Sequence, residues 1–159
     1  MNLVSSGSNT IFDVRPDGGL IFARYVGNGR SDPSGATGWD PNTGNQIGNG
    51  WGDVRLVAGG GNGVIFAVRA DGALLYFKYV GSGQSDPSAA TGWDPNSGNQ
   101  IGNGWQGVSQ LVGGDNGVIF ASRPNGDLLY FKYTGSGESD PSGATGFDPN
   151  SGNQIGHGF

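Results

Sequence analysis

The sequence predicts an all-β protein built from three copies of one structural unit, and three observations lead to that prediction. The first is a repeat, because Trp51, Trp105 and Phe159 close the same pattern and are spaced 54 residues apart. The second is a hairpin signal that recurs in every copy. The third is the distribution of 34 glycines, which interrupt every window long enough to hold a helix. A tandem unit of this length is typical of arrays in which each repeat packs against its neighbours.

The register of the repeat holds along the whole chain without insertions. The segments Gly63–Trp105 and Gly117–Phe159 differ at only ten of 43 aligned positions, which indicates recent duplication or deliberate engineering. We therefore expect one repeat domain, residues 1–159, divided into units of approximately 1–50, 51–104 and 105–159. Any functional site should recur in all three.

Each unit is expected to contain about four short strands. In the middle copy, Val54–Val57 is a short apolar segment, and the glycine-rich stretch 59–63 is interpreted as its end. Residues 64–69 and 74–79 follow as two apolar and aromatic runs. They flank Asp71-Gly72, a strong hairpin signal that recurs as Asp17-Gly18 and Asn125-Gly126. A polar loop, residues 81–92, leads to a fourth, edge-like strand around residues 100–101.

Four short strands in each unit match the size of a β-propeller blade. More specifically, the string Gln-Ile-Gly-Asn-Gly-Trp at residues 46–51 is followed by an apolar strand, a hairpin and Leu-Leu-Tyr-Phe-Lys-Tyr at residues 74–79. This sequence of features resembles the tachylectin-type β-propeller blade over essentially the whole chain, three times. The resemblance implies a lectin that binds N-acetylated sugars such as N-acetylglucosamine, with one site per blade. The unit is longer than expected for the sugar-binding members, and the surplus lies in the polar loop.

Three blades cannot close a ring, because propellers typically have about four to eight. We expect a second chain to complete it head to tail, which gives a homodimer with six blades. Phe159 occupies the Trp51 position of the unit and Met1 the Arg55 position, so the gap between two chains is about four extended backbone steps. The alternatives are a fragment of a longer five- or six-bladed protein and a less regular oligomer.

The polar loop supplies both parts of a sugar site, an aromatic platform and hydrogen-bonding side chains. On the functional interpretation, the aromatic ring stacks on the sugar while Asp and Asn bind its hydroxyls. On the structural interpretation, Asp-Pro-Asn-Ser-Gly is a turn that satisfies its own backbone donors. The predicted carbohydrate-binding residues are Trp39, Asp40, Asn42 and Asp32; Trp93, Asp94, Asn96 and Asp86; and Phe147, Asp148, Asn150 and Asp140.

A different role is expected for the aromatic residue that closes each unit. Trp51, Trp105 and Phe159 follow a tight glycine turn, and burial of such a ring between sheets contributes about 2–3 kcal/mol. The third copy also carries Phe147, Phe159 and His157 where the second has two tryptophans and an asparagine. Because phenylalanine offers less surface and no indole donor, we expect the third site to bind more weakly than the others.

Composition argues against several other classes. Eight basic and thirteen acidic residues, with no basic cluster, make nucleic acid an unexpected partner. No apolar run approaches the length of a membrane span, and no signal peptide is recognisable. We therefore expect a soluble chain without membrane insertion, either cytoplasmic or exported by a non-classical route. A chain with no cysteine and one histidine, His157, has no recurring nucleophile–base pair, so neither enzymatic activity nor a cofactor or metal is expected.

The sequence is also consistent with two alternatives to a lectin. Asp-Pro-Ser and Asp-Pro-Asn supply oxygens for a calcium-binding structural module, although the prolines break the Asp spacing of known calcium loops. A designed or duplicated symmetric scaffold without a specific ligand is the second.

Overall fold

The computed structural model describes residues 2–159 and contains three four-stranded antiparallel sheets. The strands are β1 (Asn2–Ser5), β2 (Thr10–Val14), β3 (Leu20–Arg24) and β4 (Gln46–Gly48) in the first sheet; β5 (Val54–Gly61), β6 (Val64–Arg69), β7 (Leu74–Lys78) and β8 (Gln100–Gly102) in the second; and β9 (Gln110–Gly113), β10 (Val118–Ser122), β11 (Asp127–Lys132) and β12 (Asn153–His157) in the third. Strands follow chain order within each sheet, as expected for propeller blades, and the all-β prediction is confirmed. We call the sheets the first, second and third blade. The one helix in residues 2–159 is the short 3₁₀ turn η1 (Trp105–Gly107).

The predicted hairpins form the centre of each blade. In the second blade β6 pairs with β7 from Val64↔Lys78 to Val68↔Leu74, and Gly72 occupies the turn with φ of 88°. Asp71 stabilises this turn, since its Oδ1 accepts a hydrogen bond of 3.0 Å from the backbone N–H of Ala73. The fourth, edge-like strand around residues 100–101 is also confirmed, as β8.

The glycine-rich stretch after Val57 forms part of a strand, although the sequence analysis placed the end of the strand there. Instead of ending the strand, glycine continues β5 as far as Gly61. The physical reason is the close approach of neighbouring inner strands: a Cβ on Gly59 would overlap the carbonyl oxygen of Ser5 on β1, and one on Gly113 would overlap that of Gly59. Glycine is therefore selected here by the distance between blades, and the interpretation of this segment as a strand end was wrong.

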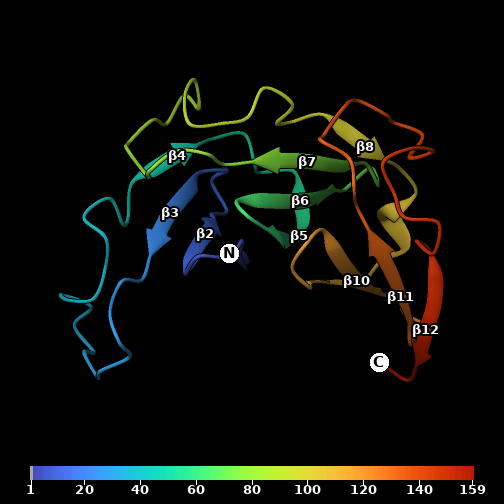
Figure 1. Ribbon diagram of the computed structural model, residues 1–159, viewed down its shortest axis with the longest axis horizontal. Helices are drawn as coiled ribbons and strands as arrows, with labels where there is room; N and C mark the ends of the chain where they lie inside the picture. Colours follow the sequence, from blue (N-terminus) through green and yellow to red (C-terminus); the bar gives the residue numbers. More distant parts are fainter. Residues whose placement is uncertain (1) are drawn as a thin grey trace.

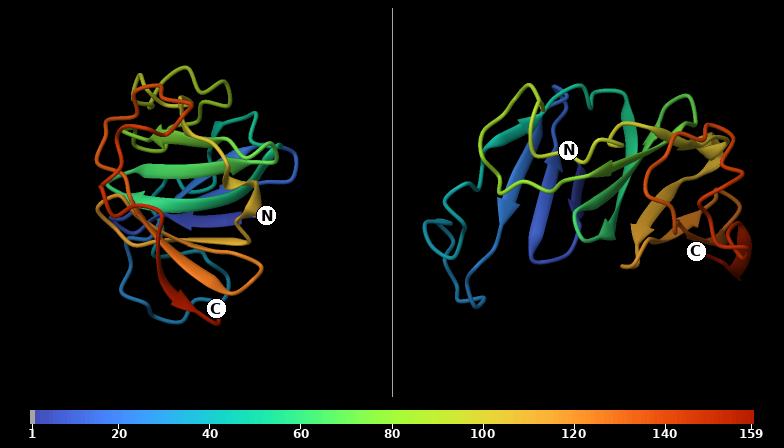
Figure 2. Two further views of the ribbon diagram at one scale, coloured as in Figure 1. Left: turned by 90° about the vertical axis from the view of Figure 1, so that its right-hand side faces the viewer. Right: turned by 45° about the horizontal axis from the view of Figure 1, so that its top comes forward.

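The three blades lie side by side in an open arc, with β4, β8 and β12 along its outer side (Figure 1). The long loop of the second blade, residues 81–99, reaches back over the first blade, and the loop of the third blade reaches back over the second (Figures 1 and 2). The equivalent loop of the first blade, residues 27–45, extends away from the other blades in the same views.

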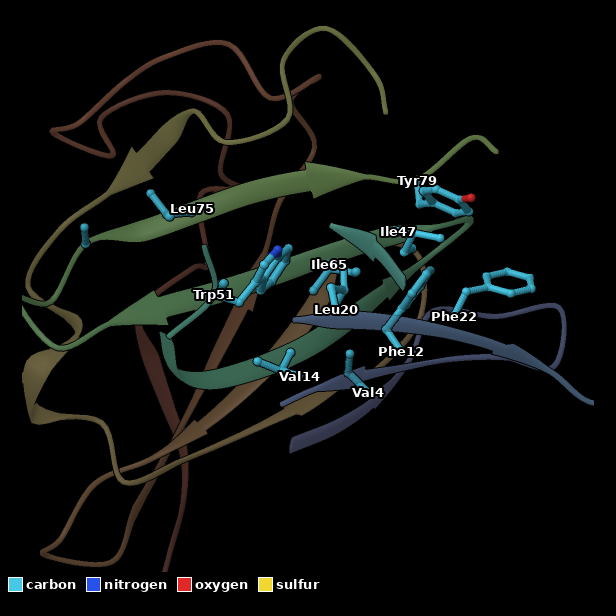
Figure 3. Packing of buried hydrophobic residues seen from close by; sticks show 12 residues of the cluster. Val4, Phe12, Val14, Leu20, Phe22, Ile47, Trp51, Ile65, Leu75 and Tyr79 are labelled. Carbon is cyan, nitrogen blue, oxygen red and sulfur yellow. The ribbon is translucent and has the colours of Figure 1, made fainter. Parts of the chain in front are cut away.

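The hydrophobic core lies between blades. One cluster joins the first and second blades and includes Phe12, Phe22, Ile47, Trp51 and Ile65 (Figure 3). A second cluster of equivalent residues joins the second and third blades. Because each blade buries its apolar face only against a neighbour, the blades are not independent folding units, as expected for a repeat architecture.

Candidate functional site

The long loop of each blade is held at its base by a tyrosine, which is buried in the second and third blades and partly buried in the first. In the second blade, Tyr79 forms an isolated β-bridge with Trp93, and its hydroxyl accepts a hydrogen bond of 2.8 Å from the backbone N–H of Gly83. Burial raises the pKa of Tyr79, so the phenol stays protonated. Tyr25 and Tyr133 make the equivalent bridges to Trp39 and Phe147. This geometry fixes the position of the aromatic residue that sequence analysis assigned to the sugar site.

A pocket of about 310 Å³ lies at the junction of the first and second blades. Its aromatic wall is made by Trp51, Phe77 and Trp93, with ring centroids 4.3 Å apart for Trp51–Phe77 and 6.0 Å for Phe77–Trp93. The polar lining includes Asp94 and, from the first blade, Asn49; Ser97, Ala89 and Ala90 complete it. The pocket therefore combines a flat apolar surface with a few polar groups, as in sites for small ligands.

The same pocket recurs between the second and third blades, with a volume of about 350 Å³. Trp105, Phe131 and Phe147 form its wall, and Asp148 and Asn103 are the polar equivalents of Asp94 and Asn49. Trp105 and Phe131 lie 4.4 Å apart between centroids, which reproduces the Trp51–Phe77 pair. Repetition of lining residues at both junctions is the expected signature of a repeated site.

The predicted site residues divide into two groups. Trp93, Asp94, Phe147 and Asp148 line the two junction pockets. The asparagines two positions after each aspartate do not line them. Instead, the backbone N–H of Asn96 donates to Asp94 Oδ1 at 2.9 Å, and its side-chain amide donates to the carbonyl of Ser136 in the third blade. Asn42 repeats these contacts with Asp40 and Ser82, and the backbone N–H of Asn150 donates to Asp148.

The aspartates at the start of the loop organise the loop itself. Asp32 Oδ2 accepts hydrogen bonds of 2.8 Å from both the backbone N–H and the hydroxyl of Thr37, and Oδ1 accepts one from Ser34. These bonds lower the pKa of Asp32 from 3.8 to about 2, the side-chain bond from Ser34 having the largest effect. Asp86 and Asp140 have the same partners in their own loops, Ser88 with Thr91 and Ser142 with Thr145. Neither lines a junction pocket.

Several pocket residues were not among those predicted from the sequence. Asn49 and Asn103 come from the end of the preceding blade, and Phe77 and Phe131 come from β7 and β11. Trp51 and Trp105, expected to be packing residues, are buried but also form part of the wall. The sequence contained a signal, because the Asn-Gly-Trp string and the Tyr-Phe pair each occur in two copies of the repeat. Nothing in the sequence indicated that they face one loop.

The first blade carries only half of such a pocket. Trp39 packs edge-on against Tyr25, with centroids 5.2 Å apart, and stays 37% exposed. It borders a hollow of about 490 Å³ together with Asp32 and Asn28. Asp40 adjoins Trp39 in the chain. Within residues 2–159, however, no preceding blade supplies residues equivalent to Asn49 and Trp51, which line the pocket at the first junction.

Each pocket combines residues from two repeats, so the substitutions found in one repeat do not all fall in the same pocket. Phe147 shares its pocket with Trp105, whereas Phe159 lies at the far edge of the third blade, 71% exposed. The two phenylalanines of the third copy therefore do not share a site. His157 accompanies Phe159 at that edge, where its Nδ1 lies 3.0 Å from Asp127 Oδ1.

Within residues 2–159, no three His, Cys, Asp or Glu side chains gather in an arrangement that could hold a metal ion. The same residues form no helix with the length and apolar character needed to cross a bilayer.

The four-stranded sheets and the pocket at each junction define a protein built from β-propeller blades. The family model described as Tachylectin matches residues 2–147, and the chain belongs to this family. Membership indicates lectin-type carbohydrate binding, and the resemblance identified in the blade sequence is confirmed. A search of curated proteins found no match to the chain.

Proposed function

We propose that this protein is a multivalent lectin that binds N-acetylated sugars such as N-acetylglucosamine, with one site per blade. The observation that carries the proposal is the recurrence of one pocket at both blade junctions. Each pocket sets three aromatic rings beside a carboxylate, an amide and a hydroxyl. Its volume, about 310–350 Å³, falls at the small end of the range for pockets that bind small molecules.

The proposed contacts follow from the chemistry of the pocket. The C–H face of a pyranose ring packs on the aromatic wall formed by Trp51, Phe77 and Trp93. Asp94 uses Oδ1 to accept from Asn96, and no described residue donates to Oδ2, so that oxygen is available to a sugar hydroxyl. Asn49 and Ser97 stand beside it to bind further hydroxyls or the acetamide. Glycans are accordingly the proposed partners.

The proposal is for binding without catalysis. His157 is the only histidine of the chain, and it lies at the blade edge, paired with Asp127 and away from both junction pockets. Each pocket contains one carboxylate, whereas glycoside hydrolysis generally uses two on opposite sides of the scissile bond.

We also propose that two chains assemble head to tail into a ring of six blades. Multiples of three blades reach the usual propeller range of about four to eight only as two chains. Several weak sites on one rigid ring raise the local concentration of ligand at each free site, so avidity is the proposed mechanism of binding to glycan-bearing surfaces.

Titration with N-acetylglucosamine, followed by chemical-shift changes, tests the proposal. We expect saturable shifts of the Trp93 indole resonance with this sugar and much smaller ones with glucose, which lacks the acetamide. Trp93→Ala should abolish binding at the first junction, while Val80→Ala, at an exposed position outside both pockets, should leave it unchanged. No shift with any N-acetylated sugar would refute the proposal.

A thermal-shift comparison separates the remaining alternatives. Stabilisation by N-acetylglucosamine supports the lectin, because a ligand that binds only the folded state raises its stability. A lower melting temperature in EDTA supports a calcium-binding module. The absence of both effects supports a scaffold without a ligand.

A further inference from the structure

The two junctions between blades use one repeated set of polar contacts. At the first junction, the side-chain amides of Asn45 and Asn49 donate to the carbonyl oxygens of Gly83 and Pro87, and the backbone N–H of Asp86 donates to Gln46. At the second junction the residues 54 positions later make the same bonds: Asn99 with Gly137, Asn103 with Pro141, and Asp140 with Gln100. At each junction, therefore, asparagine side chains at the end of one blade donate hydrogen bonds to carbonyl oxygens in the long loop of the next blade.

The two ends of the arc, formed by the first and the third blade, carry the two halves of this same junction. Ile155 is 53% exposed on the third blade, whereas Ile47 and Ile101, its equivalents, are each 1% exposed within a junction. Val112 is 60% exposed, whereas its equivalent Ala58 is 2% exposed. On the opposite edge the loop of the first blade stands clear of the body (Figures 1 and 2). These apolar positions are buried wherever a neighbouring blade is present.

Polar groups at the two edges complete the correspondence. The third blade presents Asn153 and His157, the counterparts of Asn45 and Asn49. The first blade presents the carbonyl oxygens of Gly29 and Pro33, the counterparts of Gly83 and Pro87. An imidazole N–H can replace an amide as donor to the Pro33 carbonyl. Each edge thus fits the other, and the occupant that matches both is a second copy of this chain.

The structure assigns a third pocket of the same kind to the junction between two copies, with Trp39 and Asp40 from one copy and His157 and Phe159 from the other. The sugar that fills it rests on the proposed function, whereas the junction itself rests on the repeated contacts. Each half is incomplete alone, since Trp39 lacks a neighbouring ring from a preceding blade and Phe159 lacks a loop. Two copies close the ring and give two such pockets.

The junction pocket differs in composition from the two internal ones. Ala23 stands where Phe77 and Phe131 form the middle of the aromatic wall, and Phe159 replaces a tryptophan. Because two rings then face the sugar instead of three, the junction pocket takes the same class of N-acetylated sugar more weakly. The two pockets between copies are also the only pockets of the ring that contain an imidazole, from His157 of each copy.

The inner strands at this junction are farther apart than those within the chain. Ser5 occupies the position of Gly59 and Gly113, where a Cβ would overlap the carbonyl of the preceding inner strand. The contact between copies therefore depends on the outer parts of the blades, where the pocket lies. Ser5→Gly is expected to strengthen association by removing this obstacle.

Engineered disulfides test the junction directly, because the chain has no cysteine. A Cβ placed on Gly48 lies 3.7 Å from the Cβ of Ala89 across the first junction, within the usual disulfide range of about 3.5–4.5 Å. The equivalent pair between copies is Gly35 and Gly156. Ala89 has φ of 58°, so a side chain is accommodated at the Gly35 position, and the exposed ring of Phe159 can move away from a new side chain at 156.

We expect Gly35→Cys/Gly156→Cys to form a covalent dimer on mild oxidation. The matched control, Gly48→Cys/Ala89→Cys, should form its disulfide within one chain and migrate as a monomer. Single variants should cross-link only when Gly35→Cys and Gly156→Cys are mixed, which establishes the head-to-tail direction. The proposal is overturned if the control disulfide forms while the test pair stays reduced, or if the test pair gives a ladder of larger species.

Sedimentation of the unmodified chain should give twice the mass of one chain, and a monomer mass overturns the proposal independently of the variants.

Sugar titration separates failure of the junction pocket from failure of the proposed function. With N-acetylglucosamine we expect the Trp39 indole resonance, assigned by its loss in Trp39→Phe, to shift along with that of Trp93. In Phe159→Ala the Trp39 shift should disappear while the Trp93 shift persists. Response of Trp93 alone in the unmodified protein refutes the third pocket, and response of neither refutes sugar binding while the disulfide result still stands.

Discussion

The indole N–H of Trp93 donates a hydrogen bond of 3.1 Å to the carbonyl oxygen of Ile47 in the neighbouring blade. The same side chain therefore forms part of the pocket wall and links two blades by a hydrogen bond. Its counterpart in the third blade, Phe147, has no donor, so the carbonyl of Ile101 receives no such bond. A single difference between repeats thus changes both a sugar pocket and a blade junction.

Exchange of these two aromatic residues should change stability in opposite directions. Trp93→Phe leaves the Ile47 carbonyl without its partner and is expected to cost about 1–3 kcal/mol of unfolding free energy. Phe147→Trp adds the missing bond to Ile101 and is expected to stabilise by about 0.5–1.5 kcal/mol. Chemical denaturation measures both. Equal effects of the same sign would show that the indole bond is not the cause.

The two internal pockets should differ in affinity. The pocket at the second junction has Phe147 in place of Trp93, and a smaller ring offers less surface to a sugar face. We expect weaker binding of N-acetylglucosamine there, and Phe147→Trp should raise its affinity toward that of the first junction. Ligand occupancies in crystals titrated with sugar measure the difference. Equal occupancy of both pockets at sub-saturating sugar would contradict it.

The repeat made most of the fold predictable. Hairpins at Asp71-Gly72 and its equivalents, and the edge strand at residues 100–102, follow from local turn chemistry and apolar spacing. The continuation of β5 through its glycine-rich part could not be predicted in this way. Glycine is required there because Gly59 lies too close to Ser5 of the first blade for a side chain to fit. Propensity describes a residue's own backbone and does not report such long-range contacts.

The site was predictable only in part, for a related reason. The loop aromatic Trp93 and its neighbour Asp94 were found because they are adjacent in the sequence. Asn49 and Phe77 were missed because they reach the pocket from a preceding blade and from β7, and only the curvature of the arc brings them together. Turn-forming residues such as Asp32 look like ligands in sequence because carboxylates serve both purposes.

Alanine at Gly59 should be far more disruptive than alanine at a glycine without close neighbours. Gly59→Ala places a Cβ against the carbonyl of Ser5, so β1 and β5 must separate, at an expected cost of about 1–3 kcal/mol or more. Gly107→Ala is the matched control, because a Cβ there meets no atom within 4 Å and its φ is negative. Its effect should stay within about 0.5 kcal/mol. Thermal or urea unfolding of both variants measures the contrast, and similar losses would refute the close-approach explanation.

Acid should leave the loops ordered well below the usual range of aspartate titration. Hydrogen bonds from Ser34 and Thr37 lower the pKa of Asp32 from 3.8 to about 2, and equivalent bonds do the same for Asp140. Since the folded-state pKa lies below the unfolded value, the stabilisation is complete above pH 3.8 and is lost as pH falls through about 2. Carboxyl carbon shifts should therefore give midpoints near 2 for both residues. Thr37→Val should raise the Asp32 midpoint toward 3.8 and leave that of Asp140 unchanged, and unperturbed midpoints in the unmodified protein would show that these bonds do not organise the loop.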